Sequence, residues 1–438
     1  MPPGHRLGVL RGHPTRATGR KTAILLSGLL CACGDAGSPR PQDLRQDTYI
    51  WQRQWTAATA DAAHGTDKTI RQLLVLAAEF PATDGASHKM NRIPVPWEKL
   101  RGRDIGVVLR IHRPDKAFFD GDPRPLAETV GTTASQVLTD ARTLRIHECQ
   151  IDFDCPTRSL ETFAPLMRAL RAREADMRWT FTALPDWLGR DGFGDLARSA
   201  DGFVLQVHSL KLPEAAARVV PLCTVEESVR WIGRASRVGV PFRVALPTYF
   251  SRVFFDLSGR VIDVVSEEPE SAAAQQADAV ALAVTEVDTL LDLRARLWCK
   301  PPANFEGICW FRLPTADDRW ILSTEAFAKV LRGARPKSGI RLRADAQPEG
   351  FLKIVAENTG EIPVVPPIRV SLIWDDGHRL VAADGVAATR MRPSGCGATV
   401  EWREREWPTL LAPGERRILG WIRLDPADAG VRCVPENE

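Results

Sequence analysis

The chain has 438 residues, of which 44% are hydrophobic and 26% are charged, a composition that excludes a wholly disordered protein. Its length predicts two or three domains, and no apolar run reaches the roughly 18 residues that a membrane-spanning helix needs. The formal charge is +3, but residues 1–33 hold five basic and no acidic residues, which leaves 53 basic against 55 acidic residues elsewhere. This balance offers no electrostatic reason to bind nucleic acid.

Residues 1–33 have the features of an export signal. Basic residues at 16, 20 and 21 precede the short apolar stretch 23–30, and small residues follow it. The run Leu-Cys-Ala-Cys at 30–33 resembles a bacterial lipobox, in which the last cysteine, here Cys33, receives a lipid. We therefore expect a protein of the bacterial cell envelope that Cys33 anchors to a membrane, facing the periplasm or the exterior, with residues 34–47 as a linker. The alternative is a buried N-terminal helix that carries two cysteines by chance.

Seven cysteines follow Cys33, and the oxidising space outside the cytoplasm permits disulfides. Cys299 with Cys309, and Cys396 with Cys433, are plausible pairs, and the odd count leaves at least one thiol free. No Cys-x-x-Cys pair occurs and the histidines are scattered, so the sequence predicts neither a metal site nor a bound cofactor.

Between residues 48 and 336, short runs of β-branched or aromatic residues alternate with amphipathic stretches. The expected strands are 49–55, 73–80, 105–111, 148–153, 179–184, 203–208, 242–249 and 307–313. The expected helices are 57–71, 124–142, 159–174, 186–199, 224–237, 275–298 and 316–333. Eight strand–helix units in about 290 residues predict a closed (β/α)8 TIM barrel with a parallel sheet. The alternative is an open, doubly wound sheet, but no glycine-rich phosphate loop follows the first strand.

The chain departs from this repeat in two places. The seventh and eighth strands begin 65 residues apart, and the extra residues 251–271 contain two alternating runs around a Ser-Gly turn. They predict a hairpin that stands over the barrel mouth as the wall of a cleft. From residue 337 the helical pattern stops, and short strands are expected at 350–358, 368–374, 398–402 and 416–424. A barrel over residues 48–336 is thus predicted to precede a β-sandwich over residues 337–438.

Alternation along barrel strands separates side chains that face the lumen from those that face the helices. The polar set is expected inside, and it lies at the C-terminal ends of the strands, with little charge elsewhere in the runs. The residues expected at this mouth are Trp51, Arg53, Glu79, Arg110, Asp152, Asp154, Thr182, Gln206, His208, Tyr249, Trp310 and Arg312. Barrel enzymes build their active sites at this end. The alternative is a ring of ion pairs in which the three arginines neutralise the carboxylates.

Carboxylates beside aromatic rings suit sugars as ligands. Aromatic rings stack on the apolar face of a pyranose, and two carboxyl groups can divide glycoside cleavage between a proton donor and a nucleophile or base. No Gly-x-Ser-x-Gly elbow occurs, so acyl transfer by a serine has no support.

Five motifs lie at or near the ends of the expected strands. They are Ile50-Trp51-Gln52-Arg53, Gln150-Ile151-Asp152-Phe153-Asp154, Thr182-Ala183-Leu184-Pro185-Asp186-Trp187, Leu205-Gln206-Val207-His208 and Val244-Ala245-Leu246-Pro247-Thr248-Tyr249. Together they resemble an uncharacterised bacterial family of exported proteins, known only as a domain of unknown function. The resemblance spans about residues 48–335 and implies a barrel and an envelope location.

A more distant resemblance is to chitinase-like glycoside hydrolases. These proteins place an Asp-x-Asp run on the fourth strand, which Asp152 and Asp154 match, and an insertion after the seventh. Their run continues to a glutamate that donates the proton, but this sequence has Pro156 there, and Glu161 lies too far into the next helix to replace it. The departure speaks against the substrate-assisted mechanism of chitinases.

We therefore predict an envelope-anchored barrel protein that acts on a polysaccharide or oligosaccharide as a glycoside hydrolase. Asp154 is the first candidate for catalysis and Glu79 the second, with Asp152 orienting or supporting Asp154. The predicted substrate-binding residues are Trp51, Arg53, Arg110, Gln206, His208, Tyr249, Trp310 and Arg312. The alternative is a non-catalytic glycan-binding or scaffold lipoprotein with a neutralised mouth, and a polysaccharide deacetylase or lyase is a third.

Overall fold

The computed structural model describes residues 44–80, 89–111, 122, 124–208, 218–266, 272–386, 388–395, 397–403, 409–427 and 430–436. The expected export signal and the lipid attachment expected at Cys33 lie outside these residues. Within them, no helix is both long and apolar enough to cross a membrane.

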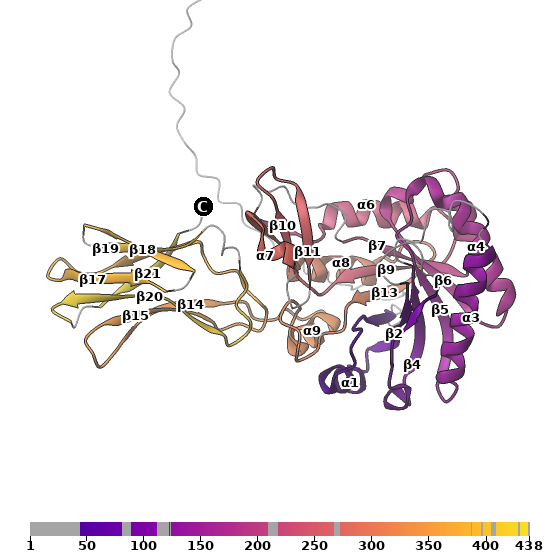
Figure 1. The fold of residues 1–438 in the computed structure, drawn as a ribbon, viewed down its shortest axis with the longest axis horizontal. Helices are drawn as coiled ribbons and strands as arrows, with labels where there is room; N and C mark the ends of the chain where they lie inside the picture. Colours follow the sequence, from indigo (N-terminus) through magenta and orange to yellow (C-terminus); the bar gives the residue numbers. More distant parts are fainter. Residues whose placement is uncertain are drawn as a thin grey trace, which may run out of the picture. The chain divides into compact units, whose positions relative to one another are not determined.

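Eight parallel strands close into a barrel (Figure 1). They are β1 (Gln46–Ile50), β2 (Ile70–Glu79), β4 (Asp104–Arg110), β5 (Arg145–Asp152), β6 (Arg178–Ala183), β7 (Gly202–Gln206), β9 (Phe242–Pro247) and β13 (Phe305–Phe311). Each strand pairs with the next of these along the chain, and β13 pairs with β1. The predicted closed barrel is confirmed, and the open sheet is wrong. β1 begins inside the segment expected to be a linker.

Helices pack around the barrel between successive strands. They are α1 (Ala57–His64), α3 (Arg124–Asp140), α4 (Leu160–Arg173), α5 (Phe193–Ser199), α6 (Val225–Ser236), α8 (Val287–Cys299) and α9 (Thr324–Leu331), with 3-10 turns η1 (Trp97–Leu100), η2 (Thr157–Ser159) and η3 (Pro185–Trp187). Their apolar faces and the outward side chains of the strands form one core, in which Phe163, Phe181 and Trp187 are completely buried. Hydroxyl caps start several of these helices; the Thr224 side chain, for example, accepts the Glu227 N–H ahead of α6.

A four-stranded sheet is inserted around the seventh barrel strand, β9. Its order is β11 (Val261–Val265), β10 (Ser251–Phe255), β12 (Ala279–Val284) and β8 (Val219–Pro221), with the short helix α7 (Ala272–Gln275) between β11 and β12. β10 and β11 are the predicted hairpin, whose turn is closed by the Ser258 and Arg260 N–H groups donating to the Asp256 carboxylate. β12 falls within the expected helix 275–298, which is wrong there. A short, wholly apolar run fits a buried strand as well as a helix.

Residues from 340 onward form two antiparallel sheets of four strands. The first, the β14 sheet, has the order β14 (Ile340–Ala346), β15 (Leu352–Asn358), β20 (Arg416–Asp425) and β17 (Arg379–Gly385). The second, the β18 sheet, has the order β18 (Thr389–Ser394), β19 (Gly397–Trp402), β16 (Arg369–Ile373) and β21 (Arg432–Glu436). Side chains of both sheets, such as Ile354, Val370 and Val400, share one apolar cluster. The expected region of short strands is confirmed, and β14, β17, β18 and β21 are additional to the predicted strands.

One further strand belongs to the barrel sheet: the two-residue strand β3 (Asn91–Arg92) pairs with the end of β2.

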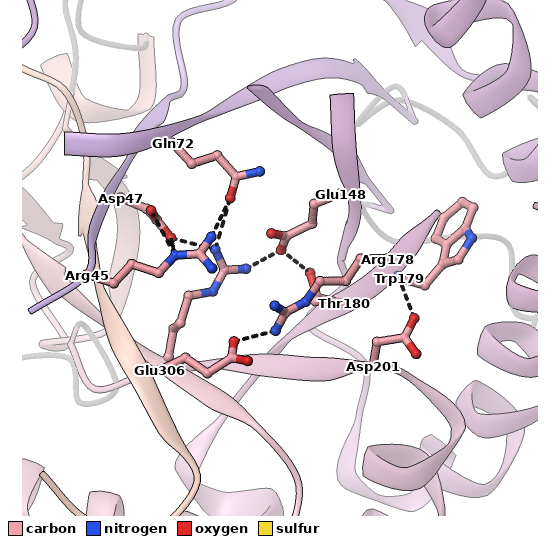
Figure 2. Close-up of polar contacts among 10 residues, drawn as sticks. Arg45, Asp47, Gln72, Glu148, Arg178, Trp179, Thr180, Asp201 and Glu306 are labelled. Carbon is pink, nitrogen blue, oxygen red and sulfur yellow. Dashed lines mark hydrogen bonds and ion pairs between the residues drawn. The ribbon is translucent and has the colours of Figure 1, made fainter. Parts of the chain in front are cut away.

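A layer of buried ion pairs fills the lumen at the N-terminal ends of the strands, and Figure 2 shows its members Arg45, Asp47, Gln72 and Glu148. The Arg243 side chain, 1% exposed, donates from Nη1 to Asp47 at 2.8 Å and from Nη2 to Glu148. Arg45 donates from Nε to Asp47 at 2.8 Å and from Nη2 to Gln72 at 2.7 Å. This pairing offsets the cost of burying the two carboxylates. The expectation of little charge outside the mouth is therefore wrong. We call residues 45, 47, 72, 148 and 243 the lower ion-pair layer.

Apolar side chains occupy the lumen above the lower ion-pair layer. They include Leu74, Leu76, Val108, Val204, Ala245 and Cys309. Cys309 carries a free and completely buried thiol, so its expected pairing with Cys299 is wrong. Cys433 is also a free thiol, and its expected partner Cys396 lies outside the described residues.

Candidate active site

A pocket of about 610 Å³ opens at the C-terminal ends of the barrel strands, and we call it the mouth pocket. All but two of the residues expected at the mouth line it: Trp51, Arg53, Arg110, Asp152, Asp154, Thr182, Gln206, His208, Tyr249 and Arg312. Residues 263–266, at the end of β11, add a wall, so the expected position of the hairpin beside a cleft is confirmed. Tyr49, Ala245 and Phe311 also line the pocket, although their apolar character gave no sequence signal for a site.

Two residues expected at the mouth do not line the pocket. Trp310 points into the core toward helix α9, where its ring lies 5.9 Å from that of Phe327 and its Nε1 donates to Gln46 at 3.2 Å. The expectation for Trp310 is wrong because this stretch of β13 is apolar on both faces, so alternation could not set the phase. Glu79 lies beside the lining, with its carboxylate held by Arg53 through two bonds of 2.6 and 2.9 Å.

Two acids, Asp152 and Asp154, face the mouth pocket where β5 ends. Parallel register pairs Asp152 with Arg110 at the end of β4, and the Arg110 Nε lies 3.5 Å from the Asp152 carboxylate. Burial and the neighbouring Asp154 carboxylate raise the pKa of Asp152 to about 6, although Arg110 and a hydrogen bond with Thr182 oppose the shift. Asp152 therefore still carries a proton in weakly acidic solution.

Within the described ranges, no group of three or more histidine, cysteine or acidic residues could hold a metal ion.

Aromatic rings pack against one another along one side of the mouth pocket. Phe311 lies at the centre, with ring centroids 5.0 Å from Trp51, 5.5 Å from Tyr49 and 5.6 Å from Tyr249. The Arg110 guanidinium lies 5.5 Å from the centroid of the Trp51 ring, within range of a cation–π contact. Because Trp51 is only 7% exposed, it supports Arg110 and Phe311 and offers little free surface for stacking on a sugar.

His208 and Tyr249 form a hydrogen-bonded pair in the pocket lining. His208 Nδ1 lies 3.2 Å from the Tyr249 hydroxyl, and the imidazole stacks on Phe311 at 5.6 Å. The Gln206 amide donates to the backbone oxygen of His208 at 3.1 Å. Burial lowers the pKa of His208 to about 3, so the ring is uncharged at neutral pH. His208 can therefore orient Tyr249 as a neutral group, but it is a poor proton donor at that pH.

Arg312 connects the hairpin wall to the barrel. Its Nη2 donates to the Asp318 carboxylate and, at 3.4 Å, to the backbone oxygen of Ser266. The peptide bond between Phe311 and Arg312 is cis. Arg312, which directly follows strand β13, thus holds the hairpin wall beside the barrel, so the position of the wall depends on this side chain.

Replacing Asp152 by asparagine is expected to stabilise the protein at neutral pH but not in acid. The folded-state pKa of about 6 exceeds the roughly 3.9 of an unfolded aspartate, so the wild type loses stability as the pH rises between these values. At neutral pH the difference is about 1–3 kcal/mol, since a tenfold change in proton affinity corresponds to about 1.4 kcal/mol. Urea unfolding at neutral pH and below pH 4 measures it, and the two proteins should be equally stable in acid. A variant less stable than the wild type at neutral pH would contradict the raised pKa.

Comparisons with known proteins extend the sequence resemblances. Residues 122–316 match a family described as a domain of unknown function, DUF3142. No curated protein matches the chain in sequence. Among solved structures, the chain is similar to the spore cortex-lytic enzyme SleL of Bacillus megaterium, at 10% identity over 68% of this chain and 76% of that chain, with a TM-score of 0.48. It is also similar to a chitinase from Chromobacterium violaceum, at 11% identity over 66% of this chain and 98% of that chain, with a TM-score of 0.45. The expected resemblances to a domain of unknown function and, distantly, to chitinase-like proteins are confirmed.

Proposed function

We propose that the mouth pocket binds a carbohydrate chain and cleaves a glycosidic bond in it. One observation carries the proposal: Asp152 and Asp154 share an open pocket, and the pKa of Asp152 is raised to about 6. Glycoside cleavage needs one carboxyl group that still holds a proton and a second that acts as nucleophile or base. Two neighbouring acids, one with a raised pKa, meet this requirement.

In this proposal Asp152 donates the proton to the leaving oxygen, and Asp154 acts as the base or nucleophile. Arg110 would stabilise Asp152 once the proton has left, because its Nε lies 3.5 Å from the carboxylate. Glu79 would position Arg53 instead of donating a proton, because both of its oxygens already accept bonds from that guanidinium. The assignment differs from the sequence prediction, in which Asp154 and Glu79 were the first two candidates and Asp152 had a supporting role.

Neutral hydrogen-bonding groups around the two acids support a sugar as the ligand. Thr182, Gln206 and Tyr249 all line the pocket and can bond hydroxyl groups without adding charge. The ring of Phe311, which also lines the pocket beside Tyr249, offers an apolar surface. A volume of about 610 Å³ lies within the usual range of ligand sites.

A second function, glycan binding without cleavage, is favoured by the arginines at the mouth. Arg53 already pairs with Glu79, and Arg110 lies close to Asp152. In this alternative the carboxylates fix the arginines, and the arginines and the neutral groups bind the sugar without chemistry.

We further propose, from the pattern of residues 1–33, that the protein is exported and anchored at Cys33 in the cell envelope, where polysaccharides are at hand. Labelling of cells with a fatty-acid probe should mark the wild type and leave Cys33→Ser unmarked. An equally labelled variant would reject the anchor.

We also propose that the two C-terminal sheets, which share one apolar cluster, form the expected β-sandwich.

A screen of the full chain against soluble cell-wall and exopolysaccharide fragments, with detection of new reducing ends, tests the proposed cleavage. The matched negative control is the double variant Asp152→Asn/Asp154→Asn, which keeps the size of both side chains and removes both acids. We expect new reducing ends with the wild type alone. Fragments that bind both proteins equally and are never cleaved would reject the hydrolase and support glycan binding.

A further inference from the structure

One carboxylate of the β18 sheet gathers three arginines. Glu401 on β19 accepts hydrogen bonds from their Nε atoms: Arg369 at 3.1 Å, Arg392 at 2.6 Å, and Arg390. The arginines cover the acid, so the Glu401 side chain is 6% exposed while theirs are 51–60% exposed. Strand register explains the arrangement, because Glu401 is the direct neighbour of Arg390 on one side and of Arg369 on the other.

The cluster lies on the face of the β18 sheet that turns away from the apolar core. Its neighbours in sequence, Val370, Met391 and Val400, point the other way, into the apolar cluster of the two C-terminal sheets. Because successive side chains alternate between the two faces of a strand, the arginines stand on the open face. We call residues 369, 390, 392 and 401 the arginine face.

The arginine face carries more positive charge than its carboxylate neutralises, since three guanidinium groups share one acid. The charged residues of the neighbouring strand β21 on this face, Arg432 and Glu436, balance each other. Each of the three arginines uses only its Nε on Glu401. Among the described residues, no hydrogen bond joins their terminal Nη atoms to another protein group.

We propose that the arginine face binds an acidic polysaccharide through its carboxylate, sulfate or phosphate groups. A guanidinium presents parallel N–H donors that match such groups, and Glu401 holds three guanidiniums in place before a ligand arrives. The Cα atoms of Arg390 and Arg392 are about 7 Å apart on one strand, and their guanidinium groups converge on one oxygen of Glu401, so the positive charge is concentrated at one place on the sheet. The near balance of 58 basic and 55 acidic residues in the whole chain disfavours a nucleic acid. The proposal does not depend on cleavage at the mouth pocket.

Affinity electrophoresis of the full chain in gels with polygalacturonate, and with dextran as the neutral polysaccharide, tests this proposal. We expect polygalacturonate, but not dextran, to retard the wild type. Arg390→Gln/Arg392→Gln should bind at least about tenfold more weakly, because it loses two charge-assisted contacts. Arg390→Lys/Arg392→Lys keeps the charge but lacks the planar donor pair, and it should also bind more weakly than the wild type.

The matched control is Arg343→Gln/Arg416→Gln, which removes two arginines that pair with Glu357 on the β14 sheet. This control should bind polygalacturonate as the wild type does, and thermal unfolding checks that each variant is folded. Four results would overturn the proposal. They are no binding by the wild type, equal weakening by both glutamine pairs, full binding by the lysine variant, and tighter binding of the wild type to phosphatidylglycerol vesicles than to polygalacturonate.

Discussion

Replacing Arg243 by methionine is expected to destabilise the barrel by about 3–5 kcal/mol. Arg243 bonds two almost completely buried carboxylates, Asp47 and Glu148. Methionine fills much of the same space, but it leaves both carboxylates without their shared partner in a lumen that is apolar above them. A loss of this size is a large part of the roughly 5–15 kcal/mol that usually separates folded from unfolded protein. Urea unfolding followed by tryptophan fluorescence measures the effect.

Two further variants distinguish a buried pair from charge loss in general. Arg296→Met removes an exposed ion pair with Asp292, and its effect should stay within about 0.5 kcal/mol. In Arg243→Met, Asp47 keeps its ion pair with Arg45, whereas Glu148 loses its arginine partner. Adding Glu148→Gln to Arg243→Met removes that buried charge and should restore part of the stability. Equally small effects of Arg243→Met and Arg296→Met would show that the lower ion-pair layer does not hold the barrel together.

Replacing Asp154 by asparagine is expected to lower turnover by about 10²–10⁴-fold, because it removes the proposed base or nucleophile. The same change removes a negative charge that disfavours ionisation of Asp152, so the pKa of Asp152 should fall from about 6 toward its ordinary value. As the pH rises, any remaining activity of the variant should therefore be lost at a lower pH than in the wild type, because Asp152 loses its proton at a lower pH. Carbon-13 NMR of the Asp152 carboxyl group follows its titration whether or not a substrate is known.

Glu79→Gln is the matched control for Asp154→Asn. It breaks the pair with Arg53, which is 42% exposed, so its effect on stability should stay within about 1 kcal/mol. The titration of Asp152 should remain close to that of the wild type, and turnover should fall far less than in Asp154→Asn, because only the position of Arg53 is affected. Loss of turnover in Glu79→Gln with retention in Asp154→Asn would move the proton donor to Glu79 and reject the roles proposed for the two aspartates.

Much of the fold could be predicted from the sequence because each strand–helix unit of a barrel repeats one pattern. The errors fall where that pattern is ambiguous. Residues 279–284 are apolar throughout, so nothing in them separates strand β12 from the start of helix α8. β17, β18 and β21 contain few large apolar residues, so no face stands out along them. β14 does alternate apolar and charged residues, a strand signal that the prediction omitted.

The position of Glu79 shows how local irregularity limits predictions of the site. Leu74 and Leu76 face the lumen, and strict alternation from them would turn Glu79 toward the helices. A register shift between Leu76 and Ala78 in the pairing with β4 resets the phase, so Glu79 reaches Arg53 at the mouth. Nothing in a single sequence marks this bulge.

The lower ion-pair layer was missed for a different reason. Arg243 is the one charged residue in strand β9, and its partners Asp47 and Glu148 lie 196 and 95 residues away along the chain. Only the closure of the barrel brings the three side chains to the same level. A lone arginine in an apolar strand therefore predicts that a buried acid exists, but not which one.

The hairpin of β10 and β11 has a consequence for how such a barrel can change its ligand. It forms one wall of the mouth pocket, yet its strands pair within a separate sheet and contribute nothing to the ring of pairings that closes the barrel. Changes in its length or sequence would reshape the opening while leaving the cylinder intact. Mutations in this segment can thus be selected for new ligand specificities without destabilising the barrel.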